Sequence, residues 1–118
     1  MIELSTSPTT TTITVTGDLD LAERTAFPGI TARVSGLHRQ LVVIDMCAAT
    51  FLDSTGAAFL ISIADMTRRR GGVAVLRGAS ERDLFVLQIC GALESFRVDR
   101  DHSCTDERPT RPWSSTAT

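Results

Sequence analysis

The stretch LVVIDMCAATFLDSTGAAFLISIADMTRRRGG, residues 41–72, decides the fold of this 118-residue chain. Residues 41–46 form an apolar, β-branched run, which predicts a central strand buried on both faces of a sheet. After a connecting stretch over residues 47–53, the sequence from Ser54 predicts a helix. Its first half is apolar nearly all round, and its cationic end complements the helix dipole before Gly71 and Gly72.

Upstream of this stretch, residues 2–5 and 13–17 predict two strands joined by a turn that begins at Pro8. Residues 18–21 are expected to form a short loop. Thr25 is then expected to cap a helix that ends near Gly36 and has Pro28 in its first turn. One face of that helix carries Phe27, Ile30, Val34 and Leu37.

Downstream, residues 73–76 predict another strand, and residues 80–83 open a further helix with a capping-box pattern. Leu84, Leu87 and Cys90 are expected to form its buried stripe, and Gly91 to end it. Residues 95–98 predict a last short strand. From residue 99 the chain becomes polar, so we expect one domain over residues 1–98 and a disordered tail over residues 99–118.

The alternation of strands and helices predicts an α/β fold, with a mixed, partly parallel sheet and helices packed against it. With 42% hydrophobic and 22% charged residues, the composition is that of a soluble globular domain. The net charge of −2 argues against a nucleic-acid partner, which requires a basic surface. All twelve cations are Arg, so lysine Schiff-base chemistry and a P-loop lysine are excluded.

The three cysteines form no C-x-x-C pair, so we expect neither a disulfide framework nor a zinc site, and interpret all three as reduced thiols. His38 and His102 are separated in sequence from any ligand or nucleophile and are expected at the surface. We therefore predict no metal and no cofactor. The chain begins without a signal-peptide pattern, and its longest apolar run is too short to cross a bilayer, so we expect a cytoplasmic protein with no membrane insertion.

Ser54 is the sharpest candidate for function, because a hydroxyl at the start of an apolar helix can serve in two ways. Its simplest role is that of a helix N-cap, since Ser and Asp are preferred there. Alternatively, Ser54 carries a phosphate. The free N–H groups and the positive end of the helix dipole would tolerate that group, and it would add nearly two negative charges to the surface.

The order and spacing of residues 13–98 resemble the STAS-domain family of anti-sigma factor antagonists. The resemblance rests on VIDM at residues 43–46, FLDSTG at residues 51–56, the arginine-rich helix end, and VTGDLD at residues 15–20. It implies that a partner kinase phosphorylates Ser54. It also implies a partner surface made of Asp18, Asp20, Asp53, Thr55, Gly56 and Ala57. Ala57 and Ala58 depart from the Leu-Gly that many members have after the motif.

The resemblance implies a binding module and not an enzyme. The unphosphorylated form would bind a cytoplasmic anti-sigma factor of the serine-kinase type and release the sigma factor, and ATP would be used by that partner. Phosphorylation of Ser54 would switch binding off, and a protein phosphatase would reset it. One alternative is a STAS adaptor subunit of a transporter ATPase or a signalling assembly. Another is a small phosphatase that uses Asp18 or Asp20, although the rest of such a site is missing from the sequence.

Overall fold

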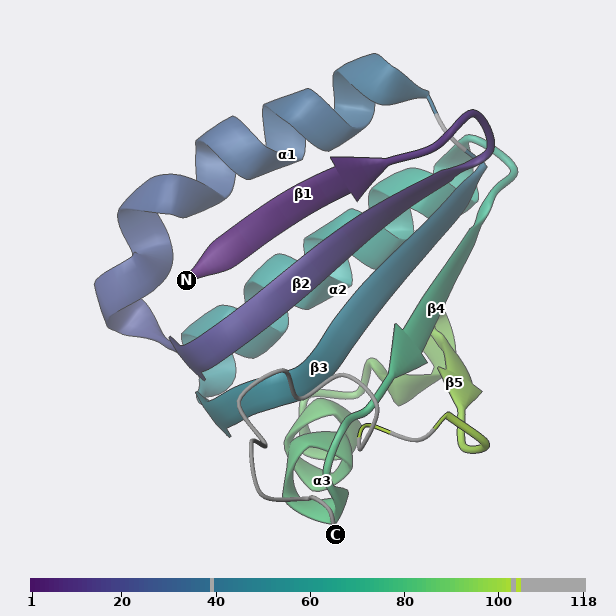
Figure 1. Cartoon of the computed structure of the whole chain (residues 1–118). Coiled ribbons are helices and arrows are strands. Elements are labelled where there is room, and N and C mark those ends of the chain that lie inside the picture. Colours follow the sequence, from purple (N-terminus) through teal and green to yellow (C-terminus); the bar gives the residue numbers. More distant parts are fainter. Residues whose placement is uncertain (39, 103, 105–118) are drawn as a thin grey trace, which may run out of the picture.

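The computed structural model describes residues 1–38, 40–102 and 104, in which five strands form one mixed sheet (Figure 1). The strands are β1 (Ile2–Thr6), β2 (Thr10–Leu19), β3 (Leu41–Leu52), β4 (Val73–Arg77) and β5 (Arg97–Asp99). They lie side by side in sequence order; β1 is antiparallel to β2, and each later pair is parallel. The predicted α/β class with a partly parallel sheet is confirmed.

Three α-helices and two short 3-10 helices connect the strands. They are η1 (Leu21–Ala26), α1 (Phe27–Leu37), α2 (Ser54–Arg69), α3 (Glu81–Ile89) and η2 (Leu93–Ser95). In Figure 1, α2 lies behind the sheet and α1 runs along its β1 edge, so the face toward the viewer carries no helix over β2 and β3. The parallel strands follow one another in sequence order, and crossovers between parallel strands are right-handed. Each crossover therefore places its helix on the same face of the sheet.

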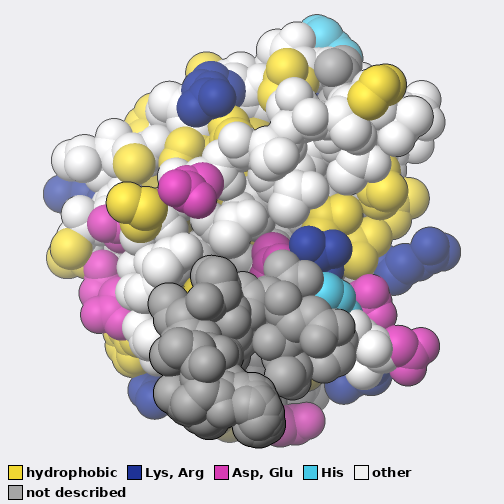
Figure 2. All heavy atoms as spheres, viewed as in Figure 1, with side chains coloured by type: hydrophobic (Ala, Val, Ile, Leu, Met, Phe, Trp, Pro, Cys, Tyr) yellow, Lys and Arg dark blue, Asp and Glu magenta, His cyan; other side chains and the backbone are white. Residues whose placement is uncertain are grey.

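The two faces of the sheet differ in chemistry, because successive side chains of a strand point to opposite sides. On β2, Ile13 and Val15 are fully buried under the helices, while Thr12 and Thr14 are only partly buried on the other face. We call this second side the open face. In Figure 2, which shows this side, hydrophobic, basic and acidic side chains are scattered among white atoms, which are other side chains and backbone.

Strands β2 and β3 extend further than the sequence predicted. The expected loop at residues 18–21 and the expected connection at residues 47–53 are in part strand, because Asp18 pairs with Phe51 and Leu19 with Leu52. Two register shifts interrupt this parallel ladder, one between Thr14 and Thr16 and one just after Gly17. These irregularities hide the strand period from sequence analysis.

Helix α1 begins differently from the prediction. Thr25 is not its N-cap: it lies inside η1, the 3-10 helix that Asp20 caps by accepting a hydrogen bond from the Ala22 N–H. The α-helix follows directly from Phe27, with Pro28 in its first turn as expected. It ends one residue beyond Gly36, and His38 closes it in the left-handed conformation with φ 53°.

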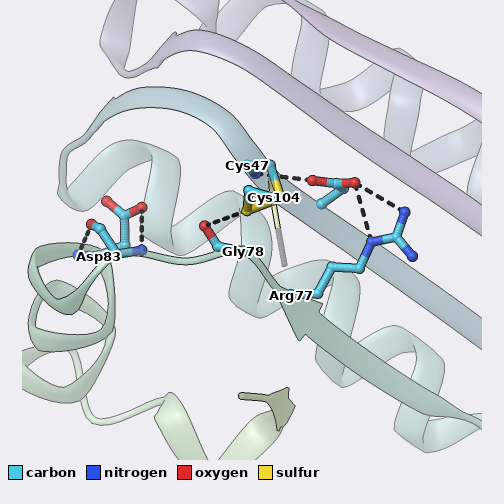
Figure 3. Close-up of a disulfide and its surroundings, with 7 residues drawn as sticks. Cys47, Arg77, Gly78, Asp83 and Cys104 are labelled. Atoms are coloured by element: carbon cyan, nitrogen blue, oxygen red, sulfur yellow. Dashed lines mark hydrogen bonds and ion pairs between the residues drawn. A yellow bond between two sulfur atoms is a disulfide. The ribbon is translucent and has the colours of Figure 1, made fainter. Parts of the chain in front are cut away.

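The capping box of α3 is confirmed. The Ser80 hydroxyl accepts from the Asp83 N–H at 3.0 Å, and the Asp83 carboxylate accepts from the Ser80 N–H at 3.4 Å (Figure 3). Leu84 and Leu87 are buried as predicted. Cys90 is not part of that stripe, because it follows the last helical residue as the C-cap and is exposed.

The prediction of three reduced cysteines is wrong for two of them. Cys47 of β3 forms a disulfide with Cys104, and the Cα atoms are 5.3 Å apart (Figure 3). The two residues are 57 positions apart in sequence, so no local spacing announces the bond. His102 is half-buried beside these sulfurs, not an isolated surface residue.

The boundary expected after residue 98 falls inside β5, which ends at Asp99. The rest of the predicted tail, Trp113 included, lies outside the described residues apart from residues 100–102 and 104. In the described part of the chain, no helix has the length and apolar character needed to cross a membrane.

Candidate functional site

The amino-terminal end of α2 is capped by Asp53, not by Ser54. Asp53 has extended backbone angles, and its Oδ1 accepts a hydrogen bond from the Gly56 N–H at 2.8 Å. Ser54 is the first helical residue. The simplest reading of Ser54, as the N-cap, is therefore wrong, because its neighbour already performs that task.

Asp53 also connects α2 to the end of β2. Its Oδ2 accepts from the Leu21 N–H at 3.2 Å, and its own N–H donates to the Leu19 carbonyl at 3.3 Å. One side chain therefore bonds to the first residue of η1 and to the first turn of α2. This arrangement brings the segment with Asp18 and Asp20 to the motif at residues 53–56, although the two are more than thirty positions apart in sequence.

Gly56 allows the close approach of these two segments. A Cβ atom built at this position would collide with the carbonyl oxygen of Leu19 and would lie 2.9 Å from its carbonyl carbon. The first turn of α2 therefore packs directly on the backbone at the end of β2. Packing, and not backbone conformation, requires glycine here, because any residue can adopt the helical backbone angles of this position.

Asp18 and Asp20 are both held in place. Asp18, exposed at the end of β2, accepts a 2.7 Å hydrogen bond from the Thr50 hydroxyl of β3. Asp20 is half-buried and caps η1. Each carboxylate thus has a hydrogen-bond partner within the fold. Within the described residues, no group of three potential metal ligands includes Asp18, Asp20 or Asp53.

Ser54 is exposed, and its hydroxyl has no hydrogen-bond partner among the described residues. Thr55 is half-buried, whereas Gly56 and Ala57 are buried. Of the residues expected to form the partner surface, those with accessible side chains are Asp18, Asp20, Asp53 and Thr55. Gly56 and Ala57 shape that surface from beneath and present no side chain to it.

Electrostatically, the site combines the neutral hydroxyl of Ser54 with three carboxylates: that of the adjacent Asp53, and those of Asp18 and Asp20 in the segment to which Asp53 bonds. The first turn of the 16-residue helix α2 supplies the opposite influence, because its free N–H groups carry partial positive charge. Asp53 uses one of these N–H groups, that of Gly56. An anion added at Ser54 would therefore gain from the helix end and be opposed by the neighbouring acids.

Sequence reasoning missed two apolar residues in the segments around the site, Leu21 and Phe51. Leu21, whose N–H is bound by Asp53, keeps 56% of its surface exposed. Phe51, three residues before Ser54, is half-buried with the Arg82 guanidinium 5.2 Å from its ring centroid. The sequence did hold a signal that Leu21 is exposed, because this large apolar residue stands between Asp20 and a run of small and charged residues. No signal linked Arg82 to Phe51, because that contact joins β3 to α3.

Comparison with solved structures places this geometry among known folds. SpoIIAA, an anti-sigma factor antagonist, in its unphosphorylated form is 19% identical, with a TM-score of 0.69 over 86% of this chain and 90% of that one. The phosphorylated form, described as a Bacillus cell fate determinant, matches with a TM-score of 0.67 at 19% identity, over 91% of this chain and 98% of that one.

Two other solved structures are similar. RsbS from Moorella thermoacetica, in a variant with a serine-to-glutamate substitution, is 18% identical, with a TM-score of 0.70 over 83% of this chain and 85% of that one. A sulfate transporter family protein from Wolinella succinogenes is 22% identical, with a TM-score of 0.55 over 74% of this chain and 73% of that one. At these identities the likeness concerns the fold.

A search of curated proteins found no match to the chain by sequence. The model of the STAS domain, however, matches residues 1–103. That match includes all five strands, the Asp53 cap and the exposed Ser54. The chain therefore belongs to the STAS domain family.

Proposed function

We propose that this chain is an anti-sigma factor antagonist switched off by phosphorylation of Ser54. The unphosphorylated form binds a cytoplasmic anti-sigma factor of the serine-kinase type and thereby frees the sigma factor. The partner uses ATP to modify Ser54, and a protein phosphatase restores the binding form. In this proposal the chain is a binding module without catalytic activity, and it takes no cofactor of its own.

The observation that carries this proposal is the exposed, unengaged hydroxyl of Ser54 at the first position of α2. Because Asp53 caps the helix, a kinase can modify Ser54 without breaking a hydrogen bond on which the fold depends. The comparison proteins support the same reading, because one anti-sigma factor antagonist of this fold is known in an unphosphorylated and a phosphorylated form.

The switch would act through local charge. A phosphate adds about 1.5 to 2 negative charges at neutral pH. Among Asp18, Asp20 and Asp53 these charges would make one acidic patch, which repels an acidic partner surface and is costly to desolvate in a tight interface. Leu21 and Thr55 lie at the same end of the domain and complete the proposed contact surface.

The test is affinity capture from a lysate of the source organism with three baits: the wild type, Ser54→Asp and Gln40→Glu. Gln40 is exposed immediately before β3, at the opposite end of that strand from Ser54, so Gln40→Glu controls for added charge alone. We expect the wild type and Gln40→Glu to retain an ATPase of the serine-kinase type, and Ser54→Asp to lose it. With ATP, mass spectrometry should then locate the phosphate on Ser54.

Ser54→Ala completes this test, because it should remain folded and bind the kinase-type partner whether or not ATP is present. Equal capture of one kinase-type partner by the wild type and Ser54→Asp would contradict the switch. So would a Ser54→Ala protein that ATP still releases from the partner.

A second candidate function is that of a constitutive STAS adaptor in a transporter or signalling assembly. The fold likeness to the sulfate transporter family protein favours it. This function predicts that all three baits retain the same transporter or scaffold components, because charge at residue 54 would not matter.

A further inference from the structure

Away from the Ser54 site, the open face holds a second cluster of reactive side chains. Cys47 comes from the middle of β3, and His102 and Cys104 come from the segment that follows β5. Their two sulfurs and a ring nitrogen of His102 all lie within 4.8 Å of one another. Cys47 is buried and the other two are half-buried, so the cluster is shielded but remains open to small solutes.

These three groups are the ligand types of a zinc site. Zinc binds thiolate sulfur at about 2.3 Å and imidazole nitrogen at about 2.0–2.1 Å in tetrahedral geometry, which sets two sulfur ligands about 3.8 Å apart. The sulfurs, bonded to each other in this structure, must therefore separate by less than about 2 Å to hold the ion. His102 and Cys104 both belong to the segment that follows β5, so they approach Cys47 from the same stretch of chain.

The lack of a side chain at Gly78 leaves space for the two sulfurs. Gly78, in the turn after β4, has φ +74°, and a Cβ atom there would collide with Cys47 Sγ and lie 2.8 Å from Cys104 Sγ. The Gly78 carbonyl oxygen is 4.0 Å from Cys104 Sγ, within reach of a thiol donor in the reduced form (Figure 3). A surface hollow lined in part by Gly78, Glu81, Asp99 and His102 adjoins the cluster on the side of its imidazole.

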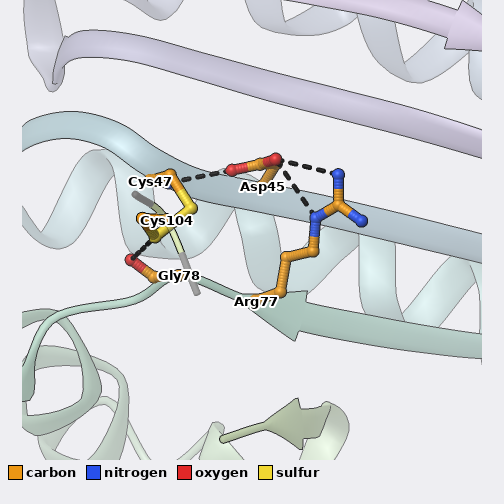
Figure 4. Close-up of polar contacts among 5 residues, drawn as sticks. All are labelled: Asp45, Cys47, Arg77, Gly78 and Cys104. Atoms are coloured by element: carbon orange, nitrogen blue, oxygen red, sulfur yellow. Dashed lines mark hydrogen bonds and ion pairs between the residues drawn. A yellow bond between two sulfur atoms is a disulfide. The ribbon is translucent and has the colours of Figure 1, made fainter. Parts of the chain in front are cut away.

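The backbone that presents Cys47 is held by an ion pair between the buried Asp45 and the half-buried Arg77 (Figure 4). Asp45 Oδ1 accepts from the Cys47 N–H at 2.9 Å, and Asp45 Oδ2 accepts from Arg77 Nε and Nη2 at 3.1 and 3.0 Å. Asp45 is only 4% exposed. Cys47 is thus held at a defined position whether its sulfur is oxidised or reduced, as a metal ligand requires.

We propose that the reduced form of the Cys47–His102–Cys104 cluster binds one Zn²⁺ ion. A phosphine reductant opens the disulfide: the phosphorus gives up two electrons and becomes the phosphine oxide with oxygen from water, and the two sulfurs leave as thiols. Zn²⁺ then displaces both thiol protons and is held by two thiolates and a neutral imidazole, with water as the fourth ligand. The two thiolates balance the charge of the ion, and the end of the chain stays joined to β3 in both states.

The test uses the full chain, reduced with a phosphine and freed of reductant under anaerobic conditions, with Co²⁺ as the spectroscopic probe. We expect one Co²⁺ per chain, with sulfur-to-cobalt charge-transfer bands and tetrahedral ligand-field bands that Zn²⁺ abolishes. Cys104→Ser should lose the charge-transfer intensity in large part, and His102→Gln should weaken binding at least about tenfold. Cys90→Ser is the matched control, because Cys90 is exposed and outside the cluster, and its spectrum should equal that of the wild type.

Both informative variants lie beyond the last strand, so circular dichroism should show the native fold and separate loss of a ligand from unfolding. Absence of charge-transfer bands in the reduced wild type would overturn the proposal. Unchanged bands in Cys104→Ser, or equal binding by the oxidised chain, would overturn it as well, because the ion would then lie elsewhere.

Discussion

Asp53 and Ser54 are adjacent, yet only Asp53 holds the start of α2. Asp53 accepts hydrogen bonds from Gly56 and Leu21, whereas the Ser54 hydroxyl has no partner among the described residues. Asp53→Ala should therefore lower the free energy of unfolding by about 1 to 2 kcal/mol through loss of the cap. Ser54→Ala should change it by less than about 0.5 kcal/mol. Urea denaturation of the two variants checks this, and an equal loss in both would contradict the assignment of the cap.

Gly56 makes a second prediction possible at the same scale. Gly56→Ala should destabilise the fold by about 1 to 3 kcal/mol, because the added methyl group meets the Leu19 backbone. Gly36→Ala is the matched control: it is also helical, nothing lies within 4 Å of its added Cβ, and it should stabilise the protein by up to about 1 kcal/mol. Thermal unfolding of both variants measures the difference, and opposite signs are the expected result.

At the scale of elements, the Cys47–Cys104 bond connects the central strand to the chain end after β5. In the chain-entropy account, closing a loop of 57 residues stabilises the fold by about 4 kcal/mol. Cys104→Ser should lose stability of that order under oxidising conditions and match the wild type when both are reduced. Denaturant titration with and without reductant tests this. A wild type whose stability is indifferent to reductant would show that the bond does not form in solution.

The sequence predicted most elements but misplaced several of their ends. The apolar, β-branched run at residues 41–46 identified β3, and the Ser80–Asp83 pattern located the start of α3, because both signals are local. The sequence missed the strand pairing beyond residue 46 because the residues there are small or polar. They are in a strand only because they pair with β2. The disulfide was missed for the same reason, since a contact between distant segments leaves no spacing to detect.

The candidate site was predicted in part. Its residues were named from the motif, and the structure brings the segments at residues 18–20 and 53–57 together through Asp53. The division between exposed and buried residues could not be predicted, because the burial of Gly56 and Ala57 depends on how α2 packs against the end of β2. The capping role fell to Asp53 because its carboxylate reaches the Gly56 N–H.

At the scale of the whole molecule, β3 is the central strand of the sheet. Residues 41–45 pair with both β2 and β4, whereas residues 48–52 pair with β2 alone. Local stability should follow this difference. In hydrogen–deuterium exchange we expect Val42 and Ile44 to be among the slowest amides and residues 48–52 to exchange faster. Equal protection along the strand would show that something covers its second half in solution.

The separation of cap from hydroxyl has a consequence for the history of this chain. A residue that carries a signal and also holds the fold cannot be replaced without loss of both. Here we expect position 54 to accept Ala, Thr or Asp, because Asp53 keeps α2 in place. Under the proposed phosphorylation of Ser54, descendants of this gene could abandon, fix or re-acquire the signal by single substitutions, and we expect the protein they encode to fold.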